Sequence, residues 1–388
     1  MRDFYKILVI DLENANKRII EKVNKNISDF YLGGYGLGLW WLHNNKDIKD
    51  AFMILTSSIS EFSNPINKYI IMAKDKNKIA YGNMGGDFSC YLKSNDYDAL
   101  VLVNKANKLS EIFIDGENII INEGKIKEDN SNSAIYNDLR NSYGNDISSI
   151  YISQSAINND KISRLIADSY RGISKDMANI LYQKNIKSIS IKRNDIRQIK
   201  KLPKDKVNLI ASCPGCISGC KVKRKHKKES IFSIKKDQSK EEKQKLKNIC
   251  EKIDQYGIDL FALSKSIIFA YDKLNDIYKF NPYDINQLED IVDNIISPDR
   301  KEIYADLAKG SKFLASKYKM EPNDNKKNGK SDSYLKIIDS VCLCFFSVDA
   351  SDLSNICQLI NKISKSNYKE SDLLDLQNEI KKMEKSLG

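Results

Sequence analysis

Three cysteines stand close together near the middle of the chain, in Cys213-Pro-Gly-Cys216-Ile-Ser-Gly-Cys220. Thiolates at this C-x2-C-x3-C spacing are typical of a metal centre that takes one further ligand from elsewhere in the sequence. The intervening proline and glycines let the chain turn sharply and point backbone N–H groups toward sulfur. A [4Fe–4S] cluster held by four cysteines is the predicted occupant, and a Zn(Cys)4 site and plain structural thiols are the alternatives.

The fourth ligand is expected from a second pair of cysteines, Cys342 and Cys344, which follow Asp339-Ser-Val. Only one of the two is required to complete four thiolates. The remaining cysteines stand singly in amphipathic or apolar contexts, where a buried, unligated thiol is the expected role. They are Cys90, Cys250 and Cys357.

Length and composition indicate a globular protein. The chain has 388 residues, of which 41% are hydrophobic and 9% aromatic, so it is long enough for two or three domains with real cores. Its N-terminus lacks the apolar stretch of a signal peptide and no window approaches a membrane span, so we expect a cytoplasmic protein that contacts no membrane. In that compartment eight cysteines favour metal ligands or free thiols over disulfides.

The formal net charge is +11, and much of the excess lies in residues 221–228, beside the cysteine loop. Such a run is compatible with nucleic-acid binding, but no aromatic side chains are interleaved with it, so a solvated basic face is the favoured interpretation. A third use is the docking of an acidic electron carrier, since complementary charge raises the association rate.

The two halves of the chain differ in their apolar pattern. From Phe4 to about Ile191, short runs rich in β-branched residues predict strands, Asp115-Gly116 indicates a hairpin, and residues 162–181 have helical spacing. After Pro203 apolar residues recur at three- and four-residue steps, which predicts helices. The predicted strands are 7–10, 69–72, 99–103, 112–114, 119–121, 150–152 and 189–191, and the later helices are 246–254, 260–274, 285–296, 303–318 and 373–387.

These patterns predict an α+β protein in which a β-rich N-terminal domain is followed by mainly helical domains. The expected domains are residues 1–200, residues 201–320 with the cysteine loop, and residues 334–388 with the fourth cysteine. Two polar stretches, residues 235–247 and 321–333, are predicted to be exposed linkers because neither can bury apolar surface. No sequence repeat is evident.

Several motifs together resemble the tungsten-dependent aldehyde ferredoxin oxidoreductase family. That family has a C-x2-C-x3-C loop followed by two D-x-x-G-L-(D/C) segments, the second of which ends in the fourth cluster cysteine. By this match Cys344 is the fourth ligand and Cys342 is dispensable. The matching segments are the cysteine loop, Asp254-Gln-Tyr-Gly-Ile-Asp259, Asp339-Ser-Val-Cys-Leu-Cys344, Leu32-Gly-Gly-Tyr-Gly-Leu37, Asn83-Met-Gly-Gly86, Tyr97-Asp-Ala99 and Lys184-Asn-Ile-Lys-Ser-Ile189.

The resemblance implies a β-rich base and two helical domains around a tungsten or molybdenum bis-pterin beside the [4Fe–4S] cluster. The implied reaction oxidises small aldehydes to carboxylates and passes the electrons to ferredoxin, and a homo-oligomer is possible. Pterin N–H groups need carboxylate acceptors, pyrophosphate tails need glycine-lined backbone and a cation, and a glutamate near the metal moves the proton. The residues matched to these roles are Asp254, Asp259 and Asp339 for the pterin, Lys68, Asn83, Gly85 and Gly86 for the tails, and Glu229 for the proton.

The sequence also departs from the family pattern. Lys68 replaces an arginine and so loses the bidentate fork, and residues 172–179 and 56–60 replace two glycine-containing loops. The segment with the catalytic histidine is missing, which leaves His43 and His226 as the histidines of the chain. Two further function classes therefore stay open: a shortened, inactive or electron-carrying relative, and a zinc-stabilised basic protein that binds nucleic acid.

The matched site residues also have simpler structural interpretations. Asp254 and Asp259 are typical of residues that cap and flank a helix turn around Gly257. The segment from Asn83 to Gly86 is also compatible with an ordinary tight turn. Glu229, which charged residues surround, is also compatible with a solvated carboxylate.

Overall fold

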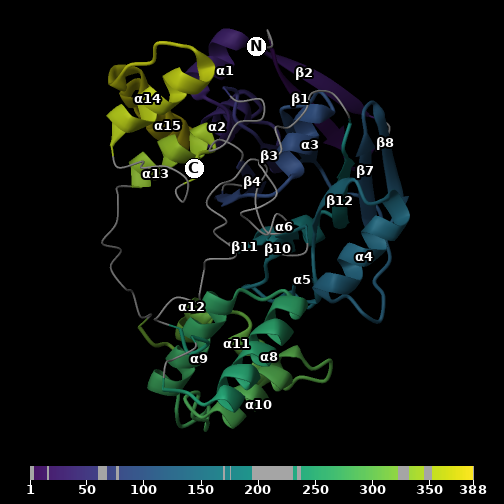
Figure 1. The fold of residues 1–388 in the computed structure, drawn as a ribbon, viewed down its shortest axis with the longest axis vertical. Helices are drawn as coiled ribbons and strands as arrows, with labels where there is room; N and C mark the ends of the chain where they lie inside the picture. Colours follow the sequence, from purple (N-terminus) through teal and green to yellow (C-terminus); the bar gives the residue numbers. More distant parts are fainter. Residues whose placement is uncertain are drawn as a thin grey trace.

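The computed structural model combines two β-sheets with separate groups of helices (Figure 1). The β-rich part comes first in the chain and the mainly helical part second, which confirms the predicted α+β class. The structure describes residues 4–14, 17–59, 68–75, 78–168, 171–174, 176–194, 230–233, 237–321, 332–344 and 352–387.

The first sheet has six strands in the order β2-β1-β6-β3-β4-β5. β1 runs parallel to β6, and the other neighbours are antiparallel. Its central strands are continuous apolar runs because both faces are covered. The strands are β1 (Phe4–Asp11), β2 (Arg18–Asn24), β3 (Asp50–Leu55), β4 (Tyr69–Asp75), β5 (Lys78–Met84) and β6 (Ala99–Val103), with helices α1 (Lys25–Tyr31), α2 (Gly34–Asn44) and α3 (Phe88–Ser94).

The second sheet repeats this topology, in the order β8-β7-β12-β9-β10-β11. Again a hairpin opens the sheet, three antiparallel strands follow, and the last strand runs parallel to the first. The repeat is structural and was not evident in the sequence. The elements are β7 (Ser110–Asp115), β8 (Asn118–Glu123), β9 (Ile147–Tyr151), β10 (Leu165–Ala167), β11 (Arg171–Ile173) and β12 (Ile186–Lys192), with α4 (Asn132–Tyr143), α5 (Gln154–Ile157) and α6 (Met177–Gln183).

One apolar core joins the two sheets, with buried residues of β1, β3, β4 and β6 from the first and of β7, β9 and β12 from the second. At one edge β5 and β11 meet, where a Cβ atom on Gly82 would lie 3.1 Å from Cδ1 of Ile173. We call the two sheets and their helices, residues 4–194, the base.

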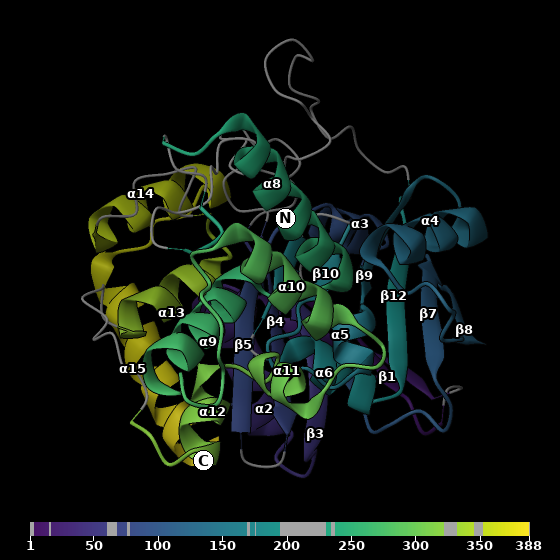
Figure 2. The same ribbon diagram turned by 90° about the horizontal axis from the view of Figure 1, so that it is seen from below.

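The helical part consists of α8 (Lys240–Tyr256), α9 (Leu260–Lys273), α10 (Ile285–Ile296), α11 (Glu302–Leu307) and α12 (Ser311–Lys317) around its own core. It lies below the base in Figure 1 and in front of both sheets in Figure 2. None of the described helices is long and apolar enough to cross a membrane.

The last helices are α13 (Asp332–Val341), α14 (Leu353–Ser364) and α15 (Glu370–Leu387). α13 and α15 pack against α2, and α14 packs against α15. Their buried residues share a core with the outer face of the first sheet. In Figure 1 they form the yellow group next to the base. This packing brings the segment that ends in Cys344 to the β-rich part of the molecule.

Three local predictions were wrong. Residues 162–181 carry β10 and β11 before α6. β10 is buried throughout and so shows no period of two, and β11 has only three residues. The predicted linker 235–247 contains the start of α8, which a capping box of Ser239 and Glu242 fixes. The predicted helix 303–318 is divided at Gly310, whose φ of 93° no helix accommodates.

Candidate functional site

Four of the predicted site residues lie outside the described part of the chain. These are the three cysteines of the loop and the candidate acid/base residue: Cys213, Cys216, Cys220 and Glu229. Among the described residues no group of three or more His, Cys, Asp or Glu side chains could hold a metal ion. The described part of the site therefore consists of the residues that would surround such a centre.

Asn83 and Asp339 are brought together from opposite ends of the chain. Asn83 lies near the end of β5 and pairs with Ile70 of β4, whereas Asp339 lies in the last turn of α13. Nδ2 of Asn83 donates a hydrogen bond of 2.8 Å to Oδ1 of Asp339. The other polar atom of the amide, Oδ1, is buried and has no hydrogen-bond partner in the described structure. A buried acceptor without a donor costs free energy, so this oxygen is suited to an N–H group of a ligand.

Lys68 adds a cation at the same end of the β4–β5 hairpin. It directly precedes β4, whose first residue, Tyr69, pairs with Met84. Burial raises the pKa of the Cys342 thiol well above its usual range, Asp339 raises it further, and Lys93 and Lys68 oppose the rise. Lys68, Asp339 and Cys342 are therefore close enough to interact electrostatically.

Gly85 and Gly86 follow β5 and are both buried. Gly86 has a φ of 126°, a conformation that L side chains rarely adopt. The turn between β5 and α3 therefore requires glycine at this position. The structure thus describes a tight turn here, next to Asn83 and across the hairpin from Lys68.

The two cysteines after α13 differ in their surroundings. Cys342 is fully buried with a φ of 57°, and its Sγ lies 3.7 Å from the carbonyl oxygen of Leu55, to which it donates. Cys344 is a free, buried thiol two residues further on. The Cys342 side chain thus contacts β3 of the first sheet.

Asp254 and Asp259, at the turn between α8 and α9, contact the base. Asp254 forms an ion pair with Arg164, which directly precedes β10. Asp259 caps α9 by accepting from the Ala262 N–H at 2.7 Å, and its second oxygen accepts from Ser174 Oγ, also at 2.7 Å. The capping interpretation therefore describes one oxygen of Asp259, and the base engages the other.

The residues that hold these two carboxylates are neighbours in the second sheet. Leu165 pairs with Ile173, so Arg164 and Ser174 occupy the next positions at the same end of the β10–β11 hairpin. Ile173 in turn packs on Gly82, the residue before Asn83. The Asp259–Ser174 and Asn83–Asp339 contacts therefore flank one strand contact, between β11 and β5.

Sequence reasoning missed Arg164 and Ser174. Ser174 falls in the segment that replaces a glycine-rich loop, so the change from glycine to a hydroxyl was the available signal. Arg164 gave no sequence signal, because its role depends on the pairing of β10 with β11. Its Nε is buried and has no hydrogen-bond partner in the described structure.

Comparisons with known proteins agree with this fold. Residues 7–193 match the family model described as aldehyde ferredoxin oxidoreductase, N-terminal domain. Among solved structures, the chain is similar to one described as "Active site complex BamBC of Benzoyl Coenzyme A reductase in complex with 1,5 Dienoyl-CoA", with a TM-score of 0.71 at 11% identity. That alignment covers 99% of this chain and 89% of the other. The comparison with curated proteins found no match.

Proposed function

Because the chain belongs to the aldehyde ferredoxin oxidoreductase family, we propose that it oxidises small aldehydes to carboxylates. The N-terminal domain of that family occupies residues 7–193, and the chain is an oxidoreductase of that general kind. The proposed cofactors are a tungsten or molybdenum bis-pterin and a [4Fe–4S] cluster. Each turnover consumes one water and releases two electrons and three protons, one of which comes from ionisation of the carboxylic acid product. The electrons leave singly to ferredoxin or a similar acidic carrier.

The observation that carries this proposal is the unsatisfied Oδ1 of Asn83 beside the Asp339 carboxylate. A pterin presents ring N–H and amino donors, which are the groups that the buried Asn83 Oδ1 lacks. The donor set and the orphan acceptor therefore fit the cofactor. When bound, the metal pterin supplies the two-electron redox change, and the protein residues hold and orient it.

The remaining described residues support the cofactor from two sides. Lys68 supplies a cation for a pyrophosphate tail, and the buried Gly85–Gly86 turn allows close approach of backbone. Asp254 and Asp259 would face the cofactor from the helical part. Glu229 is proposed to accept the proton that leaves the reacting centre.

For the cluster, we propose Cys213, Cys216, Cys220 and Cys344 as its ligands. Cys344 is supported by its buried, unpaired thiol at the end of a segment that the structure attaches to the base. We do not assign Cys342 to the ligand set, because its Sγ already donates to the Leu55 carbonyl oxygen. Since all four ligands are thiolates, iron binding should require reducing, anaerobic conditions.

One observation favours a second candidate, a relative that carries electrons or is inactive. Arg164, Ser174 and the start of α9 already engage Asp254 and Asp259, so these carboxylates have protein partners without any cofactor. A zinc-stabilised nucleic-acid-binding protein is the third and least supported class. Metal content separates the three: iron with tungsten or molybdenum, iron alone, or zinc alone.

The test is metal analysis of anaerobically purified protein from cells supplied with tungstate or molybdate. The wild type should hold iron and one of the two heavier metals. Asn83→Leu should retain iron and lose the heavier metal, because it removes both polar atoms of the amide. Iron without tungsten or molybdenum in the wild type would leave the electron carrier as the function.

A viologen-linked assay with short aldehydes then tests catalysis. Glu229→Gln should keep its metals and lose about 10²–10⁴-fold in rate, the usual contribution of a general acid or base. Equal rates for wild type and variant would remove Glu229 from the mechanism.

A further inference from the structure

The helical part is attached to the base mainly by polar contacts. Of the buried residues in the helical core, Ile162 alone comes from the base among the described residues. A cavity of about 810 Å3 also opens at this seam, lined in part by Asn158 of the base and Tyr256 of α8. Since little apolar surface is shared, hydrogen bonds and ion pairs must fix how the two parts sit on each other.

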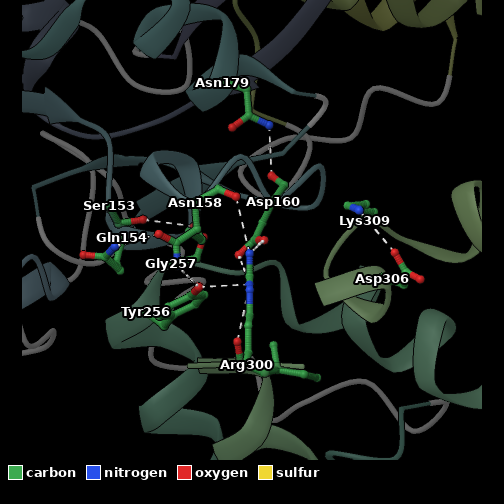
Figure 3. Close-up of polar contacts among 12 residues, drawn as sticks. Ser153, Gln154, Asn158, Asp160, Asn179, Tyr256, Gly257, Arg300, Asp306 and Lys309 are labelled. Carbon is green, nitrogen blue, oxygen red and sulfur yellow. Dashed lines mark hydrogen bonds and ion pairs between the residues drawn. The ribbon is translucent and has the colours of Figure 1, made fainter. Parts of the chain in front are cut away.

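Arg300, in the loop between α10 and α11, makes the most extensive of these contacts. Its guanidinium pairs bidentately with Asp160 of the base, at 2.7 Å from Nη2 and 3.1 Å from Nη1. It also donates to the Tyr256 hydroxyl at 3.2 Å and to the Asn158 carbonyl at 3.3 Å. Figure 3 shows Arg300 reaching from the helical part to these groups. One side chain thus joins α8, the end of α10 and the base.

Asp160 is rigidly held on the base side. Its side chain is 1% exposed, and its carbonyl oxygen accepts from Asn179 of α6 at 2.9 Å and from the Ser163 N–H at 3.1 Å. A buried pair of this kind contributes little net stability but penalises any arrangement that separates the two charges. It is therefore suited to specifying one orientation of the two parts.

Tyr256, to which Arg300 donates, belongs to the segment from Asp254 to Asp259. The residue after Tyr256 is Gly257, which has a φ of 89° and no room for a side chain, since its Cβ would lie 1.7 Å from Ser153 Oγ. Three backbone hydrogen bonds then cross the seam: Arg164 N–H to Gly257 O, Asp259 N–H to Ile162 O, and Ile162 N–H to Ala308 O, at 2.8, 2.9 and 3.3 Å.

We propose that Arg300 is a positioning residue, which through Asp160 and Tyr256 fixes residues 254–259 on the base and so sets where Asp254 and Asp259 lie. The role of these two carboxylates toward a cofactor rests on the proposed function. The positioning itself does not, because the contacts are made entirely by protein groups. The two ideas can therefore fail separately.

Hydrogen exchange of the full-length, metal-free chain tests the positioning. Arg300→Met should speed exchange of the amides of Ile162, Arg164 and Asp259 at least tenfold while leaving β1 and β6 unchanged. Arg300→Lys should give an intermediate increase, because lysine keeps the charge but loses the fork. Lys317→Met is the matched control: Lys317 pairs with Asp306 and Glu302 inside the helical part, so the seam amides should not respond.

Unchanged seam exchange in Arg300→Met, or an equal increase in the seam and the sheets, would overturn the proposal. If Arg300→Met does not fold, Arg300→Lys decides by the same amides. Absence of tungsten and molybdenum from the wild type would instead count against the proposed function and leave the exchange result standing.

Discussion

A Cβ atom on Gly34 would lie 2.2 Å from the carbonyl oxygen of Asp339, so the start of α2 and the end of α13 are in direct backbone contact. The same atom would lie 2.8 Å from Cys342 Sγ, and Gly34 has a positive φ of 37°. The contact places Asp339 where Asn83 can reach it. Glycine is therefore needed at position 34 by the predicted site as well as by the turn.

Gly34→Ala should lower the free energy of unfolding by about 2–4 kcal/mol, since strain adds to a clash with backbone that cannot easily move. Gly116→Ala is the control. Gly116 also has a positive φ, of 63°, but its nearest neighbour is 3.3 Å away, so strain alone should cost about 1–2 kcal/mol. Urea unfolding measures both, and equal losses would contradict the close contact.

β1 and β6 could be predicted because each contains a continuous apolar run that includes β-branched residues. β10 and β11 have three residues each. The spacing of the apolar residues around them also fits a helix, so the sequence predicted a helix there. The start of α8 was foreseeable, because Ser239 and Glu242 form a capping box that is visible in the sequence.

In the candidate site, too, some residues could be predicted from the sequence and others could not. Asn83 and Asp339 could be selected by motif, yet their hydrogen bond depends on how α13 packs against the first sheet. The partners of Asp254 and Asp259 could not be found at all, because Arg164 and Ser174 become neighbours through the register of β10 with β11. Arg300 likewise gave no sequence signal, since its acceptors come from separate segments of the chain.

Serine substitutions at the two cysteines after α13 should have opposite effects. Cys344→Ser should lose iron, because a serine hydroxyl is a poor replacement for a cluster thiolate. Cys342→Ser should keep iron, because Cys342 Sγ is already engaged with the Leu55 carbonyl. Iron content and the brown cluster absorbance of anaerobic protein measure both. The reverse pattern would assign the fourth ligand to Cys342.

Asp160 should make stability depend on pH. Burial raises its pKa from 3.8 to about 6, although Arg300 opposes the rise. The folded state then binds the proton more tightly than the unfolded state, so this group's contribution to stability is full below about pH 4 and is lost as pH rises through 6. The shift corresponds to roughly 3 kcal/mol.

Asp160→Asn should remove this term, because an amide does not titrate. The difference in unfolding free energy, wild type minus variant, should therefore fall by roughly 2–2.5 kcal/mol between pH 4 and pH 7. Taking the difference cancels other acids whose pKa is lowered, such as Asp284 and Glu289. A difference that grows with pH would show that pairing with Arg300 outweighs burial.

Gly257→Ala should strain the seam between the base and the helical part. The new methyl group would lie 1.7 Å from Ser153 Oγ and 2.6 Å from its Cβ, at a residue with a φ of 89°. We expect a loss of about 3–5 kcal/mol from the combined clash and backbone strain. The double variant Gly257→Ala/Ser153→Gly removes both clashing atoms, so it should recover all but about 1–2 kcal/mol of the loss caused by the substitution at Gly257. Thermal or urea unfolding of the two variants and of Ser153→Gly completes the cycle. If Ser153→Gly gives no recovery, the close approach of Gly257 to the base is wrong, and with it the path by which Arg300 positions Asp259.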